Sequence, residues 1–199
     1  MENAQTYICD PRKVILHFYP DDSPLRELLI RHSTQVRDKA FEILRHSGLQ
    51  LDRTIIESGA MLHDIGIGRC HAPGIFCHGT SPYIMHGTLG AAMLRSFAAE
   101  HNCDLEPFAR IAERHTGSGL TAQEIRRQNL PLPEQDFLPE TPEEKLICLA
   151  DKFYSKSGDL QEKSLSEIRR GMAKFGEDSL RRFDDLCSFF HISTLENMQ

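Results

Sequence analysis

Hydrophobic residues recur with the 3.6-residue period of an α-helix through most of this 199-residue sequence. No segment alternates convincingly with a period of two, so the pattern predicts an all-α chain. The longest stripe runs from Leu25 to Leu44, between a capping Ser23 and a terminating Gly48. Further helices are predicted over residues 52–64, 86–97, 104–115, 121–129 and 141–154, with one or two amphipathic helices over about 160–191.

The length and composition favour one globular domain spanning residues 1–199. The sequence is 40% hydrophobic and 26% charged, without internal repeats or low-complexity tracts. No apolar run approaches the roughly 20 residues needed to cross a bilayer. The first ten residues lack the basic stretch and apolar run of a signal peptide. We therefore expect a cytoplasmic protein without membrane contact.

The formal net charge of −6 argues against an extended nucleic-acid interface, which usually shows as a basic face. A small anionic substrate remains compatible with this charge, because bound metal cations reverse the local potential. We expect a small phosphorylated substrate as the partner, and a homodimer is an open possibility.

Six scattered cysteines do not indicate a disulfide framework in a chain of this size. Cys70-His71 and Cys77-His78 form two Cys-His pairs in one loop, from which a zinc site can be drawn. The spacing matches no common zinc motif, so we interpret the loop as the rim of another site.

Histidines and aspartates fall at inward-facing helix positions or at helix ends. His32 continues the stripe of its helix, as do His115 and Asp151 in theirs, whereas His63-Asp64 closes an apolar helix and His86 opens one. An uncompensated buried aspartate costs several kcal/mol or more, so buried carboxylates are paired or bind metals. A single buried histidine is usually a hydrogen-bonded core residue, but the joint occurrence indicates a divalent metal centre. Imidazole with carboxylate suits iron, manganese, zinc or cobalt.

The same residues resemble the HD superfamily of metal-dependent phosphohydrolases, which includes symmetrical diadenosine tetraphosphate hydrolases. "MLHDIGIG" at residues 61–68 is similar to the HDIG signature of that superfamily. The accompanying segments are "HSTQV" at His32, "HGTLGA" at His86, "ERHTG" at His115 and "EEKLICLAD" ending at Asp151. The resemblance covers about Pro24 to Ser157. The long loop from Arg69 to Tyr83 departs from the family pattern in length and composition.

The resemblance implies an HD-domain helical bundle with a metal-binding core at about 24–157 and a C-terminal helical extension at about 160–191. It further implies that His32, His63, Asp64 and Asp151 hold one metal. Asp64 then bridges to a second metal, which is also held by His86 and His115. The implied cofactors are two divalent transition metal ions, with iron first and manganese, zinc, cobalt or nickel as alternatives.

The implied reaction is attack of a metal-activated hydroxide on phosphorus, with Asp64 and His63 in the catalytic centre. Lys145 is the first candidate for a catalytic and substrate-binding cation, because it precedes Asp151 by just under two helical turns. Lys152 is expected to point away, by about 100° around the helix. The hydroxyl of Thr116 and the backbone N–H of Gly117 are further candidates for phosphate contacts.

The segment from Thr121 to Pro142 is polar and proline-rich, and it connects two ligand-bearing helices. It is interpreted equally well as a lid or as a plain connector. Its Arg126-Arg127 pair makes Arg126 a candidate substrate-binding residue.

The leading functional hypothesis is hydrolysis of a phosphate ester or phosphoanhydride in a small nucleotide-like substrate. One alternative is a mixed-valent di-iron HD oxygenase acting on a polyol or phosphonate. Another is a non-catalytic metal-binding signalling module. Oxygen dependence distinguishes the first alternative from the hydrolase, and loss of a ligand residue is the expected sign of the second.

Overall fold

The computed structural model describes residues 10–158 and 161–192. Within these ranges the α-helices are α1 (Pro11–Phe18), α2 (Pro24–Ser47), α3 (Arg53–Leu62), α4 (His86–His101), α5 (Glu106–Arg114), α6 (Ala122–Arg127), α7 (Pro142–Asp151), α8 (Leu165–Ala173) and α9 (Glu177–Phe189). Short 3₁₀ turns η1 (Ile67–Arg69), η2 (Pro73–Ile75) and η3 (Tyr83–Met85) surround a hairpin of β1 (His71–Ala72) and β2 (Cys77–His78). The predicted all-α class is confirmed.

Two elements differ from the sequence-based expectation. Helix α1 lies outside every range for which the periodicity predicts a helix. The hairpin pairs His71 with His78 and Ala72 with Cys77 in antiparallel register. Strands of two residues are too short to produce a recognisable alternation, so the sequence pattern could not reveal them.

The helix starts follow from capping side chains. Ser23 accepts a hydrogen bond from the backbone N–H of Arg26, and Thr141 forms a capping box with Glu144. Gly48 ends α2 in the left-handed conformation, at φ 69°. These local signals fix the helices that carry His32 and Asp151.

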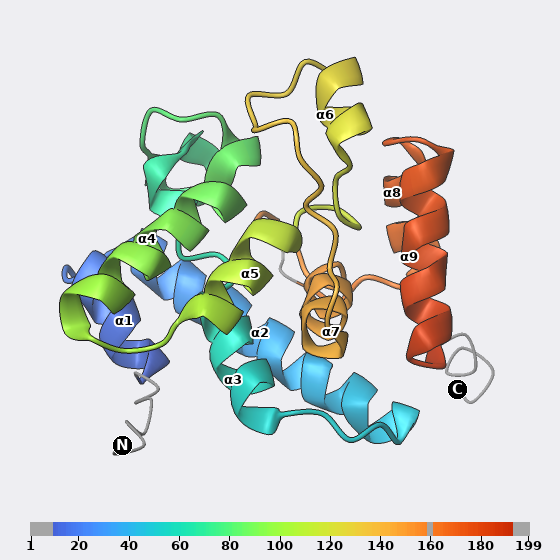
Figure 1. Cartoon of the computed structure of the whole chain (residues 1–199), viewed down its shortest axis with the longest axis horizontal. Helices are drawn as coiled ribbons and strands as arrows, with labels where there is room; N and C mark the ends of the chain where they lie inside the picture. Colours follow the sequence, from blue (N-terminus) through green and yellow to red (C-terminus); the bar gives the residue numbers. More distant parts are fainter. Residues whose placement is uncertain (1–9, 159–160, 193–199) are drawn as a thin grey trace, which may run out of the picture.

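The buried hydrophobic residues form two clusters that meet at α2 and α3. One cluster joins the C-terminal half of α2 to α7, α8 and α9, and contains Val36, Ile147 and Phe183. The other joins the N-terminal half of α2 to α1, α4 and α5, and contains Leu29 and Phe108. Figure 1 shows the same division, with α7 between the α4–α5 pair and the α8–α9 pair.

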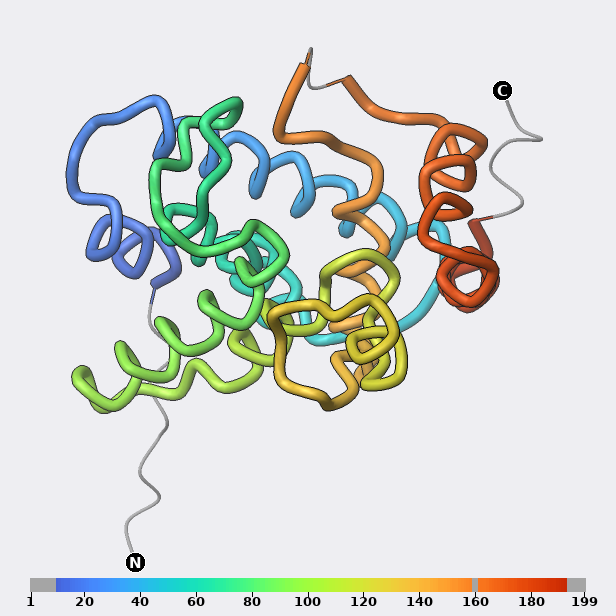
Figure 2. Tube along the Cα trace, turned by 90° about the horizontal axis from the view of Figure 1, so that it is seen from above, coloured from blue at the N-terminus to red at the C-terminus, as the bar shows by residue number. Residues whose placement is uncertain are grey.

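The chain after α7 crosses to the C-terminal helices, as Figure 2 shows in orange and red. Helices α8 and α9 contribute to the same hydrophobic cluster as α2 and α7. Among the described residues, no helix is both long and apolar enough to cross a membrane.

Candidate metal centre

Six buried side chains meet where the two hydrophobic clusters join. Their sources are α2 (His32), the turn after α3 (His63 and Asp64), the start of α4 (His86), the end of α5 (His115) and the end of α7 (Asp151). They form two groups that share Asp64, and in each group the possible ligand atoms lie within 4.8 Å of one another.

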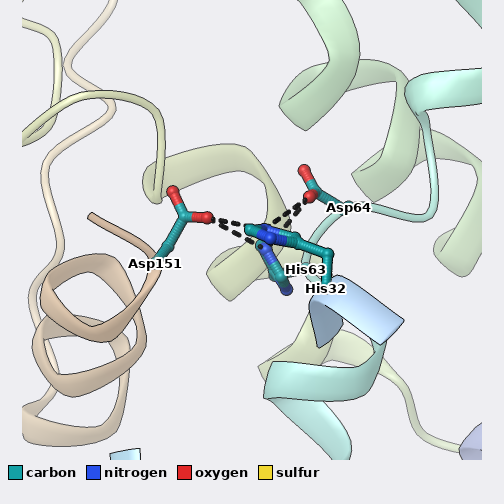
Figure 3. A group of neighbouring side chains, drawn as sticks. All are labelled: His32, His63, Asp64 and Asp151. Carbon is teal, nitrogen blue, oxygen red and sulfur yellow. Dashed lines mark hydrogen bonds and ion pairs between the residues drawn. The ribbon is translucent and has the colours of Figure 1, made fainter. Parts of the chain in front are cut away.

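The first group places two imidazoles between two carboxylates, as Figure 3 shows. His32 Nε2 lies 2.9 Å from Asp151 Oδ1 and 3.3 Å from Asp64 Oδ2. His63 Nε2 lies 3.2 Å from Asp64 Oδ2 and 3.5 Å from Asp151 Oδ1. Two nitrogens and two oxygens thus converge on one small volume.

The second group uses the other oxygen of Asp64. Asp64 Oδ1 lies 3.4 Å from His115 Nε2 and 3.6 Å from His86 Nε2. Each carboxylate oxygen therefore faces a different set of imidazoles, which is the arrangement a ligand needs in order to bridge two cations.

Backbone hydrogen bonds fix the tautomer of three of these histidines. The Nδ1–H groups of His63, His86 and His115 donate to carbonyl oxygens three residues earlier, at 2.7, 2.7 and 2.8 Å. In the neutral imidazole, each Nε2 then carries a lone pair that is directed into the cluster, as in metal-binding histidines.

The tautomers leave a repulsion that a cation relieves. His86 Nε2 and His115 Nε2 are only 3.1 Å apart, with a lone pair on each. Burial, with help from the neighbouring His115, lowers the pKa of His86 to about 3, so a shared proton is disfavoured. Burial also lowers the pKa of His115. Both nitrogens would be satisfied as ligands of a divalent cation.

Buried atoms without hydrogen-bond partners point to the same conclusion. His63 Nε2 and Asp64 Oδ1 are buried and have no hydrogen-bond partner among the described residues. Against the effect of burial, the charges of Asp64 and Asp151 raise the pKa of His63 to about 9, so without a metal ion its Nε2 binds a proton, and a divalent cation would take the place of that positive charge. The residues present therefore fit divalent metal ions.

Two lysines that follow the candidate ligand Asp151 also enter the site. Lys156 Nζ lies 2.6 Å from Asp64 Oδ2, and Lys152 Nζ lies 2.6 Å from Asp151 Oδ2. Burial alone raises the pKa of each carboxyl group, but His63 and Lys156 hold the pKa of Asp64 well below its usual range. Lys152 and Lys156 do the same for Asp151. Both carboxylates stay ionised, as metal ligands must.

Sequence reasoning did not find Lys156, and the expectation that Lys152 points away is wrong. The ammonium group of Lys152 turns back to lie 3.1 Å from the carbonyl oxygen of His115. A four-carbon stem allows this, because α7 ends at Asp151 and no longer constrains the direction of the following side chains. A lysine pair four residues apart, directly after a ligand, was the available signal.

Gly66 brings the turn that carries Asp64 against α4. A Cβ at Gly66 would lie 2.1 Å from the carbonyl oxygen of His86 and 2.4 Å from the backbone nitrogen of Gly90. Only glycine permits this approach, which positions His86 beside Asp64. The Tyr19 hydroxyl holds the same turn, since it donates to the Ile65 carbonyl at 2.6 Å.

The structure brings some of the predicted substrate contacts to the cluster and leaves others away from it. Thr116 and Gly117 line a cavity of about 240 Å³ together with His86, His115 and Asp151. These two residues are therefore available to a ligand of the centre.

Lys145 and Arg126 are not brought to the cluster. Six residues along a helix correspond to about 9 Å along its axis, and Lys145 lies in the first turns of α7, whereas Asp151 ends it. The Nζ atom of Lys145 instead lies over the ring of Phe189, 5.1 Å from its centroid. Arg126 is exposed and pairs with Glu134 at 2.9 Å. We assign neither residue to the site.

The segment between α5 and α7 is tied to α9 rather than placed over the cluster. The guanidinium group of Arg182 donates to the Gly119 carbonyl at 3.0 Å and to Glu124 at 2.8 Å. Leu120 and Phe137 exchange backbone hydrogen bonds across the segment. These contacts favour the connector interpretation over the lid.

The Cys-His loop gathers no metal-ligand group. Alternation along the hairpin buries Cys70 and Cys77 and exposes His71 and His78 on the opposite side. Among residues 10–158 and 161–192, the only groups suited to a metal are the two that share Asp64.

A larger cavity of about 620 Å³ opens beside the centre. Asp151, Lys152 and Lys156 line one part of it, and α8 lines another. The predicted helices at about 160–191 carried no candidate site residue, so their place beside the site was not expected.

Sequence relatives of this chain include an uncharacterized protein and two tRNA methyltransferases. An uncharacterized protein of Methanocaldococcus jannaschii is 35% identical over 130 residues, which are 64% of this chain and 66% of that protein. The tRNA (cytidine(56)-2'-O)-methyltransferase of Picrophilus torridus is 34% identical over 141 residues, 71% of this chain but 36% of that protein. The methyltransferase of the same name from Thermoplasma volcanium is 28% identical over 163 residues, 82% of this chain and 42% of that protein. The chain thus spans less than half the length of these two relatives.

Solved structures similar to this chain include the HD domain of the phosphodiesterase PgpH from L. monocytogenes. The TM-score is 0.47 at 16% identity, covering 96% of this chain and 99% of that one. The same domain in complex with cyclic-di-AMP gives a TM-score of 0.47 at 17% identity, covering 95% and 97%. Residues 29–155, a range that includes all six clustered side chains, match the HD domain family. Because this match includes more than half of the sequence, the chain belongs to the HD domain family.

Proposed function

We propose that this protein is a metal-dependent phosphohydrolase that cleaves a phosphate ester or phosphoanhydride in a small nucleotide-like substrate. The observation that carries the proposal is the sharing of Asp64 between two ligand groups beside a cavity bordered by lysines. Candidate metal ligands, positive charges and a cavity that can admit a substrate are therefore found together in one part of the molecule.

Divalent cations, when bound, supply Lewis acidity that lowers the pKa of water and offsets negative charge on a phosphoryl group. The protein's own groups have complementary tasks. Asp64 and the three tautomer-fixed histidines hold their donor atoms in place before any ligand arrives. Thr116 and Gly117 offer a hydroxyl and a backbone N–H to a phosphoryl oxygen.

The lysines contribute positive charge to the same volume. Lys152 and Lys156 offset the charges of Asp151 and Asp64 and line the cavity through which a substrate can approach. Hydrolysis adds the oxygen of water to phosphorus and breaks the bond to the leaving oxygen, which takes a proton. We expect the leaving group to exit into the cavity that Lys152 and Lys156 line.

The names of the curated relatives do not extend the proposal. The two methyltransferases are more than twice as long as the regions of them that match this chain. We therefore transfer no methylation activity.

The test is a substrate panel with purified, metal-analysed protein. The panel contains p-nitrophenyl phosphate, pyrophosphate, nucleoside mono-, di- and triphosphates and dinucleoside polyphosphates, each with manganese or ferrous iron. We expect metal-dependent phosphate release at the same rate with and without oxygen. Asp64→Asn should abolish this release. Asp52→Asn is the matched control, because asparagine caps a helix as well as the aspartate that now caps α3.

Two results would contradict the proposal in different ways. Turnover that requires oxygen would indicate the oxygenase alternative. Bound metal without turnover of any member of the panel would indicate a non-catalytic module.

A further inference from the structure

The 620 Å³ cavity is larger than one phosphate group requires and falls in the usual range for small-molecule sites. Part of its wall is formed by Ile168 and Met172 of helix α8 and by Phe175, two residues after the end of that helix. Ile75 and Gly74 of the loop before β2 line it as well. Apolar residues and charged residues of the metal centre thus line a single cavity.

Gly171 is a feature of this wall that helix packing does not explain. Glycine is among the least favourable residues inside a helix, yet a Cβ at Gly171 would meet no atom within 4 Å. The missing side chain therefore relieves no clash within the protein. The absence of a side chain at Gly171 leaves the backbone of α8 accessible to a ligand in the cavity.

Phe175 is the second such feature. Its ring lines the cavity and is 62% exposed, whereas the nearby apolar residues Ile168 and Met172 are buried in the core. An exposed aromatic ring beside an open helix backbone provides a flat apolar surface of the kind on which a nucleobase stacks.

Lys163 supplies a positive charge to the cavity that both this surface and Asp151 of the metal centre border. The Lys163 backbone N–H donates to the Phe153 carbonyl at 2.8 Å, which fixes the position of the residue. Of the three lysines that line the cavity, Lys152 and Lys156 pair with carboxylates, whereas Lys163 forms no ion pair with a described residue. Burial lowers the pKa of Lys163 against the pull of Asp151. An anionic ligand would relieve that cost.

The remaining acidic group of the cavity does not cancel this charge locally. The Glu167 carboxylate accepts hydrogen bonds from the backbone N–H and the hydroxyl of Ser164, both at 2.8 Å. It is thereby committed to capping α8. Lys152 and Lys156 are paired with Asp151 and Asp64, so Lys163 is the cavity-lining lysine whose charge no ion pair with a described residue offsets.

We infer that α8 selects the substrate: Gly171 and Phe175 receive the ring of a nucleobase, and Lys163 binds a phosphate adjacent to the one that is cleaved. The inference rests on the proposed function and narrows the substrate to nucleoside diphosphates or longer phosphate chains. The terminal phosphate lies at the metal centre, the next phosphate at Lys163 and the base on α8.

The base contact is tested by the ratio of kcat/KM for ADP to kcat/KM for pyrophosphate, which has the same phosphates but no base. Loss of one base–aromatic stack should reduce this ratio roughly 10-fold in Phe175→Ala. Gly171→Leu should reduce it at least as much, since leucine favours the helix and fills the space. Phe189→Ala is the matched control, because this phenylalanine on α9 is 40% exposed and does not line the cavity.

The phosphate contact is tested by Lys163→Met. Loss of one charge-assisted hydrogen bond should raise KM for ADP roughly 10-fold, with a smaller effect on p-nitrophenyl phosphate. Lys174→Met, at an exposed position after α8, is the matched control. Calorimetric binding of a methylene-bridged ADP analogue gives a measurement that does not depend on turnover, and thermal melts verify that each variant is folded.

The possible outcomes separate this inference from the proposed function. If the wild-type protein hydrolyses none of the probes, the proposed function fails. If it hydrolyses ADP and pyrophosphate but Phe175→Ala and Gly171→Leu leave the ratio unchanged, the role of α8 is refuted and the hydrolase remains. Failure of the wild-type protein to bind the ADP analogue, or its preference for p-nitrophenyl phosphate over ADP, also overturns the inference.

Discussion

Each bound metal ion should add to the stability of the folded protein, so the loss of stabilisation in ligand variants should show which residues serve one ion and which serve both. Asp64 belongs to both ligand groups, whereas His86 belongs to only one. Asp64→Asn should therefore remove the stabilisation provided by both cations, and His86→Ala should remove that of one. The comparison tests the sharing of Asp64 without reference to any substrate.

The size of each step follows from linkage. A ligand at 100 times its Kd stabilises the folded state by about 2.7 kcal/mol. For a chain of 150–250 residues, about 1 kcal/mol shifts Tm by roughly 2–4 °C, so each occupied site should add roughly 8 °C. We expect manganese to raise Tm by roughly 16 °C in the wild-type protein and roughly 8 °C in His86→Ala, with almost no rise in Asp64→Asn.

Scanning calorimetry with and without manganese provides the measurement, and each variant is compared with its own metal-free form. This comparison matters because Asp64→Asn also removes the partner of Lys156, leaving Asp151 Oδ1 at 3.9 Å. The metal-free Tm of that variant should fall for this reason alone. Asp52→Asn, the exposed control, should retain the wild-type shift. A wild-type shift in Asp64→Asn, or complete loss of the shift in His86→Ala, would refute the reasoning.

Three further changes test the surroundings of the centre. Gly66→Ala should destabilise the fold by about 3 kcal/mol in urea unfolding, because the new Cβ meets backbone atoms of His86 and Gly90 that cannot turn aside; near-wild-type stability would mean that the turn can shift. Tyr19→Phe should cost about 1–2 kcal/mol, since it removes the donor to a buried backbone carbonyl, and an unchanged urea midpoint would count against this clamp. Lys145→Ala should leave metal content and KM at wild-type values and lower stability by at most about 1 kcal/mol, the contribution of a cation–π contact. A raised KM in that variant would return Lys145 to the site.

The clustering of the proposed ligands could be predicted because their directions follow from helix register. His32 lies one turn from Leu28 and Val36, and Asp151 lies one turn from Ile147, so apolar neighbours indicate which way these side chains face. Histidine and aspartate side chains are short, so at an inward-facing helix position they have little freedom to leave the core. Helical periodicity therefore indicated the inward direction of these two side chains, whereas the division of the ligands between two metals came from the resemblance to the HD superfamily.

The lysines could not be predicted in this way. The position of a lysine Nζ depends on which partner its flexible stem reaches, and not on the register of its Cα. Lys145 was selected for its place on the ligand helix, yet its ammonium group lies over Phe189. Lys152 was expected to face away, and its ammonium group lies in the site. Sequence proximity to a ligand is thus a weak guide to the position of a long cationic side chain.

The role of α8 was hidden for a different reason. Ile168, Met172 and Phe175 have the spacing of an ordinary core-facing stripe, and the first two are indeed buried. Periodicity shows that a helix has an apolar face, but it does not show whether protein or a cavity lies opposite. Only the three-dimensional arrangement separates Phe175 from the core residues beside it.

Histidines at helix ends offer a rule that a sequence can supply. Carbonyl groups in the last turn of a helix lack intrahelical partners, so a histidine just beyond can donate its Nδ1–H to one of them. His63 and His115 do this after α3 and α5, and their Nε2 atoms face the cluster. His32, in the middle of α2, finds no such acceptor, and its buried Nδ1 has no hydrogen-bond partner within the part of the chain that the structure describes.

Two other histidines donate the same Nδ1–H hydrogen bond without being candidate ligands, so the hydrogen bond alone does not predict a metal site. His46 and His101 donate to carbonyls near the ends of α2 and α4, at 2.8 and 3.0 Å. His46 is exposed, however, and His101 stacks on Phe97 with centroids 3.9 Å apart. The helix end thus orients an imidazole, and a carboxylate such as Asp64, buried beside the free nitrogen, turns that orientation into a site for cations. A histidine at a helix end therefore predicts a ligand only where the fold also buries an aspartate against it.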